Sequence, residues 1–478
     1  MKNYEIVIGL ETHIQLNTAS KIFCSCKADS WGADPNTNIC PVCSGLPGVL
    51  PVLNAEAVQK GALLAAAMHA EINPTSYFDR KNYFYPDLPK GYQITQFDEP
   101  IGKGGYMDLH MPDGSQRRVR IHKLHLEEDA GKTKIEHGER LVDFNRCGVP
   151  LVEMVTEPDL RSADEAAQYL TQLRQLLRWI GVSEADMERG HLRCDANVSI
   201  REVGSTLLNT KTEIKNVNSI DAVRLAIIEE AKRQIEAVEA GERIQSYTLD
   251  WDADSGTLRK MRSKETEADY RYFREPDLLP VVLSPEEVAR VQSSLPELPL
   301  ARRARFIQDY QLSAYDADIL TSERGLSDYY EESVRLCAGS AKVVSNWMMN
   351  DLIRLMNDTG KSAAELRLRP ADLAEIIQLV EGGKINPSTG KSLLARVEAG
   401  AGKASQIVAD EGLGLIADED ALSQQIASVL AESAAEVESF RAGKESLLGW
   451  FVGQVMRRTG GKADPKRTRE LLLELLKQ

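Results

Sequence analysis

The segment Leu192-Arg-Cys-Asp-Ala-Asn-Val-Ser-Ile-Arg201 alternates strictly between two kinds of side chain. Neighbouring side chains on a β-strand point to opposite faces of the sheet, so this alternation predicts a strand with one buried face and one polar face. Such a strand is typical of a largely antiparallel sheet. Its apolar members are Leu192, Cys194, Ala196, Val198 and Ile200, and its polar members are Arg193, Asp195, Asn197, Ser199 and Arg201.

Residues 4–15 alternate in the same way, and helices are predicted between such strands. Asn54 can cap a helix that runs to about residue 70, and the capping box 162–165 opens a second helix that ends at Gly181. Ser219 can cap a third helix, which ends at Gly241. Because these elements lack a regular βαβ rhythm, we expect an α+β fold rather than a doubly wound sheet.

The chain after these elements has a different character. Prolines 280, 285, 296 and 299 mark a domain boundary, and the residues that follow them read as helical. A second boundary is indicated by the Gly- and Ala-rich residues 400–403. We therefore expect three domains, comprising residues 1–290, 291–402 and 403–478.

Composition indicates a soluble protein of the cytoplasm. The 478 residues are 42% hydrophobic and 27% charged, and no apolar run reaches the roughly 18 residues of a membrane span. The N-terminus has no signal-peptide core. The net charge of −14 argues against a broad nucleic-acid surface, yet residues 450–478 carry seven Lys or Arg against three acids. This reversal hints at contact with a polyanion, although a charge run of this kind is usually a solvated helix pair.

Four of the seven cysteines form two close pairs, Cys24-Ser-Cys26 and Cys40-Pro-Val-Cys43, separated by thirteen residues. Two such pairs can surround a tetrahedral Zn²⁺, and a closed four-sulfur site is structural rather than catalytic. The alternatives are four reduced cysteines or a site that has lost its metal.

Three acidic sets are candidates for catalysis. Glu11 and His13 share one strand face, and Glu127, Glu128 and Asp129 form a second set. The third set centres on Glu153, whose neighbours are apolar, so that its carboxylate needs a partner if it is buried. Mg²⁺ is a natural partner for such groups, whereas any one of them alone reads equally well as a solvated loop acid.

Two segments mix bases with aromatic residues. Residues 78–87 (Phe-Asp-Arg-Lys-Asn-Tyr-Phe-Tyr-Pro-Asp) contain Lys81, and residues 269–277 are similar. Such segments suit contact with a phosphate and a stacked ring, or form an aromatic cluster under a loop. No P-loop, dinucleotide fingerprint, kinase motif set or nucleophile elbow occurs, so the residues alone do not fix the reaction.

Taken together, the motifs closely resemble the B-subunit family of the tRNA-dependent amidotransferases. The resemblance covers essentially the whole chain and runs through residues 7–13, 78–87, 124–132, 192–197 and 269–273 in that order. It implies a cradle-shaped α+β domain followed by a helical domain and a small tail domain that binds tRNA.

The resemblance also implies a reaction and partners. ATP phosphorylates the side-chain carboxylate of Glu-tRNA(Gln) or Asp-tRNA(Asn), and ammonia then displaces the phosphate. The ammonia comes from a glutaminase of the amidase family, which is the A subunit, and a small C subunit completes the heterotrimer. The rival interpretations are a non-catalytic, zinc-containing scaffold that binds tRNA and a stand-alone metal phosphohydrolase.

The family's site maps onto individual positions of this sequence. Lys81 is expected to contact a phosphate or a carboxylate, Glu128 to lie near the metal, and Asp195 and Asn197 to complete the cradle. The zinc ligands are Cys24, Cys26, Cys40 and Cys43, and the Mg²⁺ site is expected to comprise Glu11, His13, Glu127 and Glu153.

Overall fold

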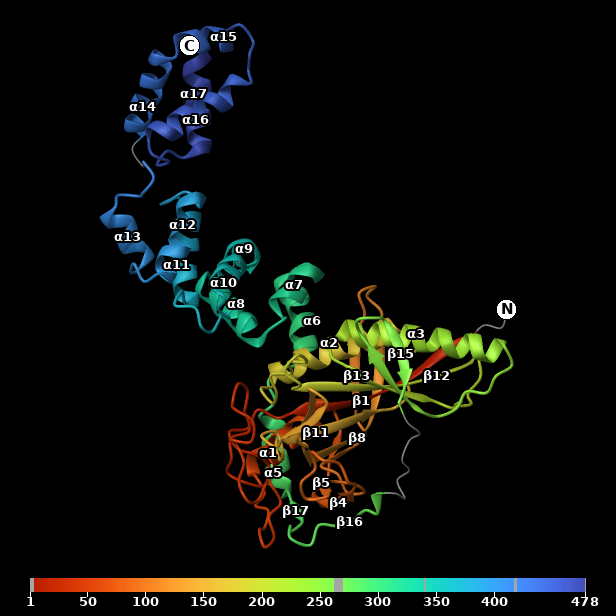
Figure 1. Cartoon of the computed structure of the whole chain (residues 1–478). Coiled ribbons are helices and arrows are strands. Elements are labelled where there is room, and N and C mark those ends of the chain that lie inside the picture. Colours follow the sequence, from red (N-terminus) through yellow and green to blue (C-terminus); the bar gives the residue numbers. More distant parts are fainter. Residues whose placement is uncertain (1–3, 262–269, 339–340, 417–418, 478) are drawn as a thin grey trace. The chain divides into compact units, whose positions relative to one another are not determined.

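The computed structural model describes residues 4–261, 270–338, 341–416 and 419–477 (Figure 1). They form two compact units, one ending at Leu300 and the other beginning at Ala301. The first unit combines a large sheet with helices, and the second contains only helices in its described residues. The predicted α+β class is therefore confirmed.

A thirteen-stranded sheet lies at the centre of the first unit. Along its main path the order is β15-β14-β13-β12-β1-β11-β8-β5-β4-β16, and every pairing is antiparallel except that of β13 with β14. The largely antiparallel sheet that the alternation predicted is thus confirmed. The strands on this path are β1 (Tyr4–Gln15), β4 (Asp79–Asn82), β5 (Tyr92–Thr95), β8 (Gln116–Glu128), β11 (Pro150–Thr156), β12 (Leu192–Glu202), β13 (Thr212–Val217), β14 (Thr248–Asp252), β15 (Thr257–Lys260) and β16 (Phe273–Arg274).

Shorter strands complete the unit. Of these, β6 and β7 pair with β8, and β2 pairs with β6. Two further pairs stand apart, β9 with β10 and β3 with β17. Their bounds are β2 (Glu71–Ile72), β3 (Thr75–Ser76), β6 (Gly102–Lys103), β7 (Tyr106–His110), β9 (Lys132–Glu136), β10 (Glu139–Asp143) and β17 (Val281–Val282).

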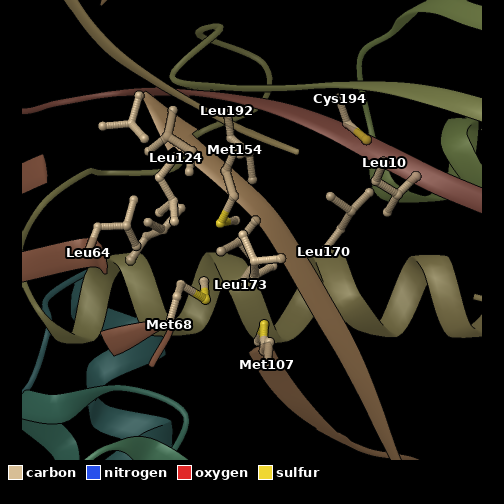
Figure 2. Close-up of a cluster of buried hydrophobic side chains, with 14 of the residues drawn as sticks. Leu10, Leu64, Met68, Met107, Leu124, Met154, Leu170, Leu173, Leu192 and Cys194 are labelled. Atoms are coloured by element: carbon tan, nitrogen blue, oxygen red, sulfur yellow. The ribbon is translucent and has the colours of Figure 1, made fainter. Parts of the chain in front are cut away.

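Helices cover one face of the sheet and bury its apolar side chains. These are α1 (Ala55–Ala67), α2 (Ala163–Trp179) and α3 (Ile220–Glu239). Figure 2 shows Leu10, Leu124 and Met154 of the sheet beside Leu170 and Leu173 of α2. Burying one such side chain contributes about 1.5–3 kcal/mol, and a register slip of one residue would turn it outward. This core therefore determines which side chains of each strand lie on the opposite, polar face.

The helix caps agree with the sequence. The side chains of Asn54, Ser162 and Ser219 each accept a backbone N–H at the start of their helix. Helix α1, however, ends at Ala67 rather than near residue 70. His69 adopts a left-handed φ of 54°, which a continuing helix does not allow.

The predicted domain boundary at 290/291 falls within α5 (Pro285–Ser293), which packs against α1, whereas the two units divide after Leu300. In the second unit one apolar cluster runs from Phe306 to Ile407 and another from Leu422 to Leu476. The predicted division at 402/403 stays a prediction. The helices from here on are α6 (Pro299–Tyr310), α7 (Ala314–Leu320), α8 (Arg324–Leu336), α9 (Ala341–Trp347), the π-helix η1 (Met348–Leu352), α10 (Ile353–Thr359), α11 (Pro370–Glu381), α12 (Pro387–Glu398), α13 (Ala404–Asp410), α14 (Glu419–Glu432), α15 (Ala434–Arg441), α16 (Leu447–Arg458) and α17 (Pro465–Lys477).

Among the described helices, none is both long and apolar enough to cross a bilayer. Asp269, with which the motif 269–273 begins, lies outside the described residues.

Candidate functional site

Four neighbouring strands bring the predicted acidic residues to the polar face of the sheet. Glu11 of β1 lies opposite Asp195 of β12. On its other side, β1 places His13 opposite Glu153 of β11, and Glu153 in turn lies opposite His125 of β8. Directly opposed residues of antiparallel strands extend their side chains on the same face. Residues up to 184 positions apart in the sequence thus become neighbours.

His13 lies at the centre of this group. Its Nε2 is 3.5 Å from Glu153 Oε2, 3.8 Å from Glu127 Oε1 and 3.9 Å from Glu11 Oε1. Two sets of possible ligand atoms overlap here, each with all its atoms within 4.8 Å of one another. One set is Glu11, His13 and Asp195, and the other is His13, Glu127 and Glu153. We call these five residues the acidic face.

His125 is a second histidine in the group, and no role was predicted for it from the sequence. Its Nε2 lies 3.4 Å from Glu153 Oε2 and 3.6 Å from Glu127 Oε2. Its Nδ1 is buried and has no hydrogen-bond partner within the described part of the chain. The signal for it was present in the sequence, because His125 precedes Glu127 by two positions on one strand and so shares its face.

The charges of this group shift one another's pKa values. Burial alone would lower the pKa of His13, but the hydrogen bond and charge of Glu153 outweigh it and raise the pKa to about 9. The pKa of His125 is likewise raised to about 9, because Glu153 and Glu127 outweigh its burial.

The carboxylates respond in two directions. Burial opposes the charge of Glu153, yet His125 and His13 hold its pKa well below the usual range. For Glu11, burial and the nearby charge of Glu153 raise the pKa to about 7. In the absence of a metal ion, two imidazolium groups therefore separate the carboxylates and reduce their mutual repulsion.

Lys81 extends from β4 over aromatic rings beside the acidic face. The two basic and aromatic segments predicted separately lie together here, because β4 pairs with β16 and Asn82 Nδ2 donates to the Tyr270 carbonyl at 3.2 Å. Lys81 Nζ is 5.0 Å from the ring centre of Tyr270 and 5.9 Å from that of Tyr83. Burial would lower the pKa of Lys81, but the charge of Glu127 and its other neighbours raise it, so the ammonium stays protonated.

Two more cations border the acidic face, and neither was assigned a role from the sequence. Lys215 Nζ of β13 lies 2.5 Å from Asp195 Oδ2. Arg193 Nη2 donates to Asp129 Oδ2 at 2.8 Å, while its Nε is buried with no hydrogen-bond partner in the described structure. Arg193 alternates with Asp195 on one strand, which could have revealed it. Lys215 comes from a neighbouring strand, and no local pattern points to it.

Two predicted residues are placed less centrally. The carboxylate of Glu128 turns to Lys90, with which it forms an ion pair, and accepts the backbone N–H of Ile94 at 2.8 Å. Asn197 lies opposite Gly9, and its Oδ1 is buried and unpartnered in the part of the chain that is described. Neither belongs to the two ligand sets above, and their roles stay predictions.

The donor set of the acidic face fits a divalent cation such as Mg²⁺. Glu11, Glu127, Glu153 and Asp195 offer carboxylate oxygens, which are the ligands that Mg²⁺ prefers, and His13 offers one imidazole nitrogen. Such an ion would take over the neutralising role of the imidazolium protons, because a coordinated imidazole must be neutral.

The four clustered cysteines also come together, in the segment 20–45, which we call the cysteine loop. The Sγ atoms of Cys24, Cys26, Cys40 and Cys43 lie within 4.8 Å of one another. The hydrogen bond between Cys24 and Cys43 lowers the pKa of Cys43 to about 4 and raises that of Cys24. Four sulfurs at this spacing fit a tetrahedral Zn²⁺ and leave no coordination position for a substrate.

Backbone hydrogen bonds connect the cysteine loop to the end of β8. The N–H of Ile22 donates to the Gly148 carbonyl at 2.8 Å, and the N–H of Gly148 donates to the Asp129 carbonyl at 3.0 Å. Gly148 has a φ of 81°, and a Cβ added there would lie 3.5 Å from the Cβ of Cys43. This connection holds the loop against the strand that carries Glu127.

The basic residues near the C-terminus are partly paired within the second unit. Arg458 forms an ion pair with Glu432 at 2.7 Å, and Arg467 pairs with Glu419 and Glu470. The predicted contact of residues 403–478 with tRNA stays a prediction.

Comparison with known proteins places this site in a family. Residues 6–289 match the family described as the GatB/GatE catalytic domain, and residues 328–476 match the family described as the GatB domain.

Curated relatives match over 98–100% of their length. A protein of Thermodesulfovibrio yellowstonii is 50% identical over 476 residues, covering 99% of this chain and 100% of the relative. One of Synechocystis is 47% identical, covering 100% and 98%, and one of Moorella thermoacetica is 47% identical, covering 99% and 100%. All three are named as the B subunit of the aspartyl/glutamyl-tRNA(Asn/Gln) amidotransferase.

Proposed function

Because this chain belongs to the GatB family of amidotransferase subunits, we propose that it catalyses the ATP-dependent amidation of Glu-tRNA(Gln), Asp-tRNA(Asn) or both. The observation that carries the proposal is the acidic face itself. Several carboxylates converge there with the ammonium of Lys81 and the guanidinium of Arg193. Phosphoryl transfer requires groups that position and neutralise charge more than groups that form covalent bonds.

The proposed reaction has two steps. A side-chain carboxylate oxygen of the tRNA-linked amino acid attacks the γ-phosphorus of ATP, the bond to the ADP oxygen breaks, and an acyl phosphate forms. Ammonia then attacks the acyl carbon, and the carbon–oxygen bond to the phosphate breaks. The amide and inorganic phosphate leave, and the phosphate takes the proton that the nitrogen loses. The acyl phosphate is needed because a carboxylate is a poor electrophile.

The acidic and basic residues of the site would have different roles in this reaction. Glu11, Glu127, Glu153, Asp195 and His13 would hold Mg²⁺, which when bound supplies positive charge to the phosphate oxygens. Lys81 would bind a phosphate or the substrate carboxylate, since its ammonium lies beside the acidic face on an aromatic support.

Partners and location belong to the same proposal. The relatives are each named as one subunit of an amidotransferase, which supports a complex of several chains. We propose that a glutaminase of the amidase family supplies the ammonia, that a small third protein completes a heterotrimer, and that the complex acts in the cytoplasm. The cysteine loop would bind a structural Zn²⁺.

The test is a pair of matched variants in the complex reconstituted from the three proposed chains. Glu11→Ala removes a carboxylate from the acidic face, whereas Glu5→Ala removes one that lies on the same strand and pairs with Arg201. We expect Glu11→Ala to lower tRNA-dependent ATP hydrolysis at least about 100-fold without weakening tRNA binding. Glu5→Ala should keep both.

Two results would contradict the proposal. If the complete wild-type complex leaves both misacylated tRNAs unchanged with ATP and glutamine present, the reaction is wrong. If Glu11→Ala keeps full activity, the chain is a scaffold that binds tRNA without catalysing the reaction. Assaying the two misacylated tRNAs side by side also identifies the substrate.

A further inference from the structure

The cysteine loop contains a lysine that is completely buried. The side chain of Lys21 is among the largest with less than 2% exposure in the described structure. Its Nζ donates to the Asn38 carbonyl at 2.9 Å and lies 3.6 Å from the Sγ of Cys43. Lysine is one of the residues least often found fully buried, because its ammonium loses its hydration. A specific partner must therefore compensate for its charge.

No carboxylate supplies that compensation in the residues that the structure describes. Every ion pair found there joins other residues, and the one carbonyl that Lys21 contacts is uncharged. The other hydrogen-bond partner of its Nζ is the sulfur of Cys43. A neutral partner would leave the buried ammonium without a counter-charge, at a cost of several kcal/mol, whereas a metal-bound thiolate would supply one.

The cluster of sulfurs has the opposite deficit. Four thiolates around one Zn²⁺ carry a net charge of −2, which is costly in a partly buried loop. Cys43 is the buried member of the four, and its sulfur also accepts the backbone N–H of Cys40 at 3.2 Å. Two donors therefore converge on this one sulfur, and both could stabilise it as a thiolate when a metal is bound.

We propose that Lys21 is a positioning residue of the cysteine loop, whose ammonium compensates the negative charge of the metal-loaded cluster through Cys43. The inference rests on the proposed zinc site and is separate from the amidation chemistry. Lys21 and the metal then stabilise each other: each is costly to bury without the other, and together they neutralise most of the charge.

The experiment compares Lys21→Met with Lys27→Met in the full-length chain. Both variants replace a lysine of the same loop with an apolar side chain of similar length, but Lys27 is exposed. The Kd for Zn²⁺ is measured by competition with a chelator, and the thermal unfolding midpoint is measured with and without Zn²⁺. Co²⁺ serves as a spectroscopic probe, because its sulfur-to-metal absorption reports the thiolates directly.

For Lys21→Met we expect the Kd for Zn²⁺ to rise about 10–100-fold and the stabilisation by Zn²⁺ to shrink. The Co²⁺ sulfur-to-metal band should also shift, while Lys27→Met behaves as wild type. Without metal, Lys21→Met should be as stable as wild type or more so, because a buried charge has been removed.

Three outcomes would overturn the inference. If the two variants bind Zn²⁺ with equal affinity, Lys21 does not compensate the charge of the cluster, and the proposed zinc site still stands. If the wild type does not bind Zn²⁺ or Co²⁺ through its sulfurs, both the zinc site and the role of Lys21 are wrong. If Lys21→Met does not fold, the same substitution is made in a chain in which Cys24, Cys26, Cys40 and Cys43 are all changed to Ala, and the stability of that chain is compared with and without the substitution. An equal loss of stability there would show that Lys21 serves packing rather than the cluster.

Discussion

The acidic face and the cysteine loop are both clusters of potential metal ligands, and their negative charges would be balanced in opposite ways. On the acidic face, cations from several strands lie among the carboxylates: His13, His125, Lys81, Arg193 and Lys215. In the described part of the cysteine loop, Lys21 is the cation that contacts a sulfur. The acidic face therefore carries its own counter-charges and would tolerate the exchange of a bound ion, whereas the cysteine loop would depend on the proposed Zn²⁺. Variants that remove ligands or counter-charges from either cluster test this contrast.

The largest effect is expected in the cysteine loop. Changing both Cys40 and Cys43 to Ser should abolish zinc binding and lower the free energy of unfolding by about 4 kcal/mol, because folding of the loop is coupled to the metal. Bound zinc is measured by atomic absorption, and stability by urea denaturation. Cys337→Ser, a buried cysteine of the second unit, is the control and should retain the metal. If the double variant keeps the zinc content of the wild type, the four cysteines are not the zinc ligands, and the loop does not differ from the acidic face in the way described.

A smaller loss is expected when the internal compensation of the acidic face is broken. Glu153→Gln in Mg²⁺-free buffer removes the nearer of the two carboxylates that buried His125 and partly buried His13 share, at a cost of about 3 kcal/mol. Glu157→Gln breaks an exposed pair with His122 and should cost under about 1 kcal/mol. Urea denaturation measures both. Equal costs would mean that the charges of the acidic face do not support its fold.

His125 offers a sharper test, because it touches two proposed ligands and is not itself one of them. His125→Gln should raise the Mg²⁺ concentration required for half-maximal ATP hydrolysis about tenfold, since Glu127 and Glu153 lose the group that orients them. The matched control is His122→Gln on the same strand, whose side chain is 62% exposed. An unchanged Mg²⁺ requirement for His125→Gln would assign that histidine to packing alone.

The smallest effect is expected from Mg²⁺ itself. Dialysis of the wild type into Mg²⁺-free buffer, with zinc retained, should lower the unfolding midpoint by no more than about 2–4 °C. The imidazolium protons can replace the ion on the acidic face. A fall as large as that caused by zinc removal would show that both clusters need their metal to fold.

The same contrast explains what could be predicted from the sequence. The ligands of the cysteine loop fall between residues 24 and 43, so their spacing alone indicated a metal site. Glu11 and His13 were readable as a pair because they are two positions apart on one strand. The approach of Glu127 and Glu153 depends on the strand order β12-β1-β11-β8, which no local pattern encodes, and only the family resemblance suggested it.

Helix starts were predictable because caps are local, as at Ser162 and Ser219. The end of α1 was not, since it depends on the left-handed backbone of His69. His125 and Arg193 were visible in alternating segments, yet their role became clear only when neighbouring strands supplied their partners. Lys215 could not be predicted from the sequence at all, because its partner Asp195 lies on a different strand.

The hydrogen-bonded path from Ile22 through Gly148 to Asp129 constrains any redesign that removes the proposed zinc site. A designer who replaces the four cysteines with apolar residues removes the proposed metal site but must still keep the loop against the end of β8. The replacement core must also accommodate the side chain of Lys21, which would then be buried without any anion. Lys21 and the cysteines should therefore be exchanged as one unit, with Gly148 left untouched, because its positive φ disfavours a side chain.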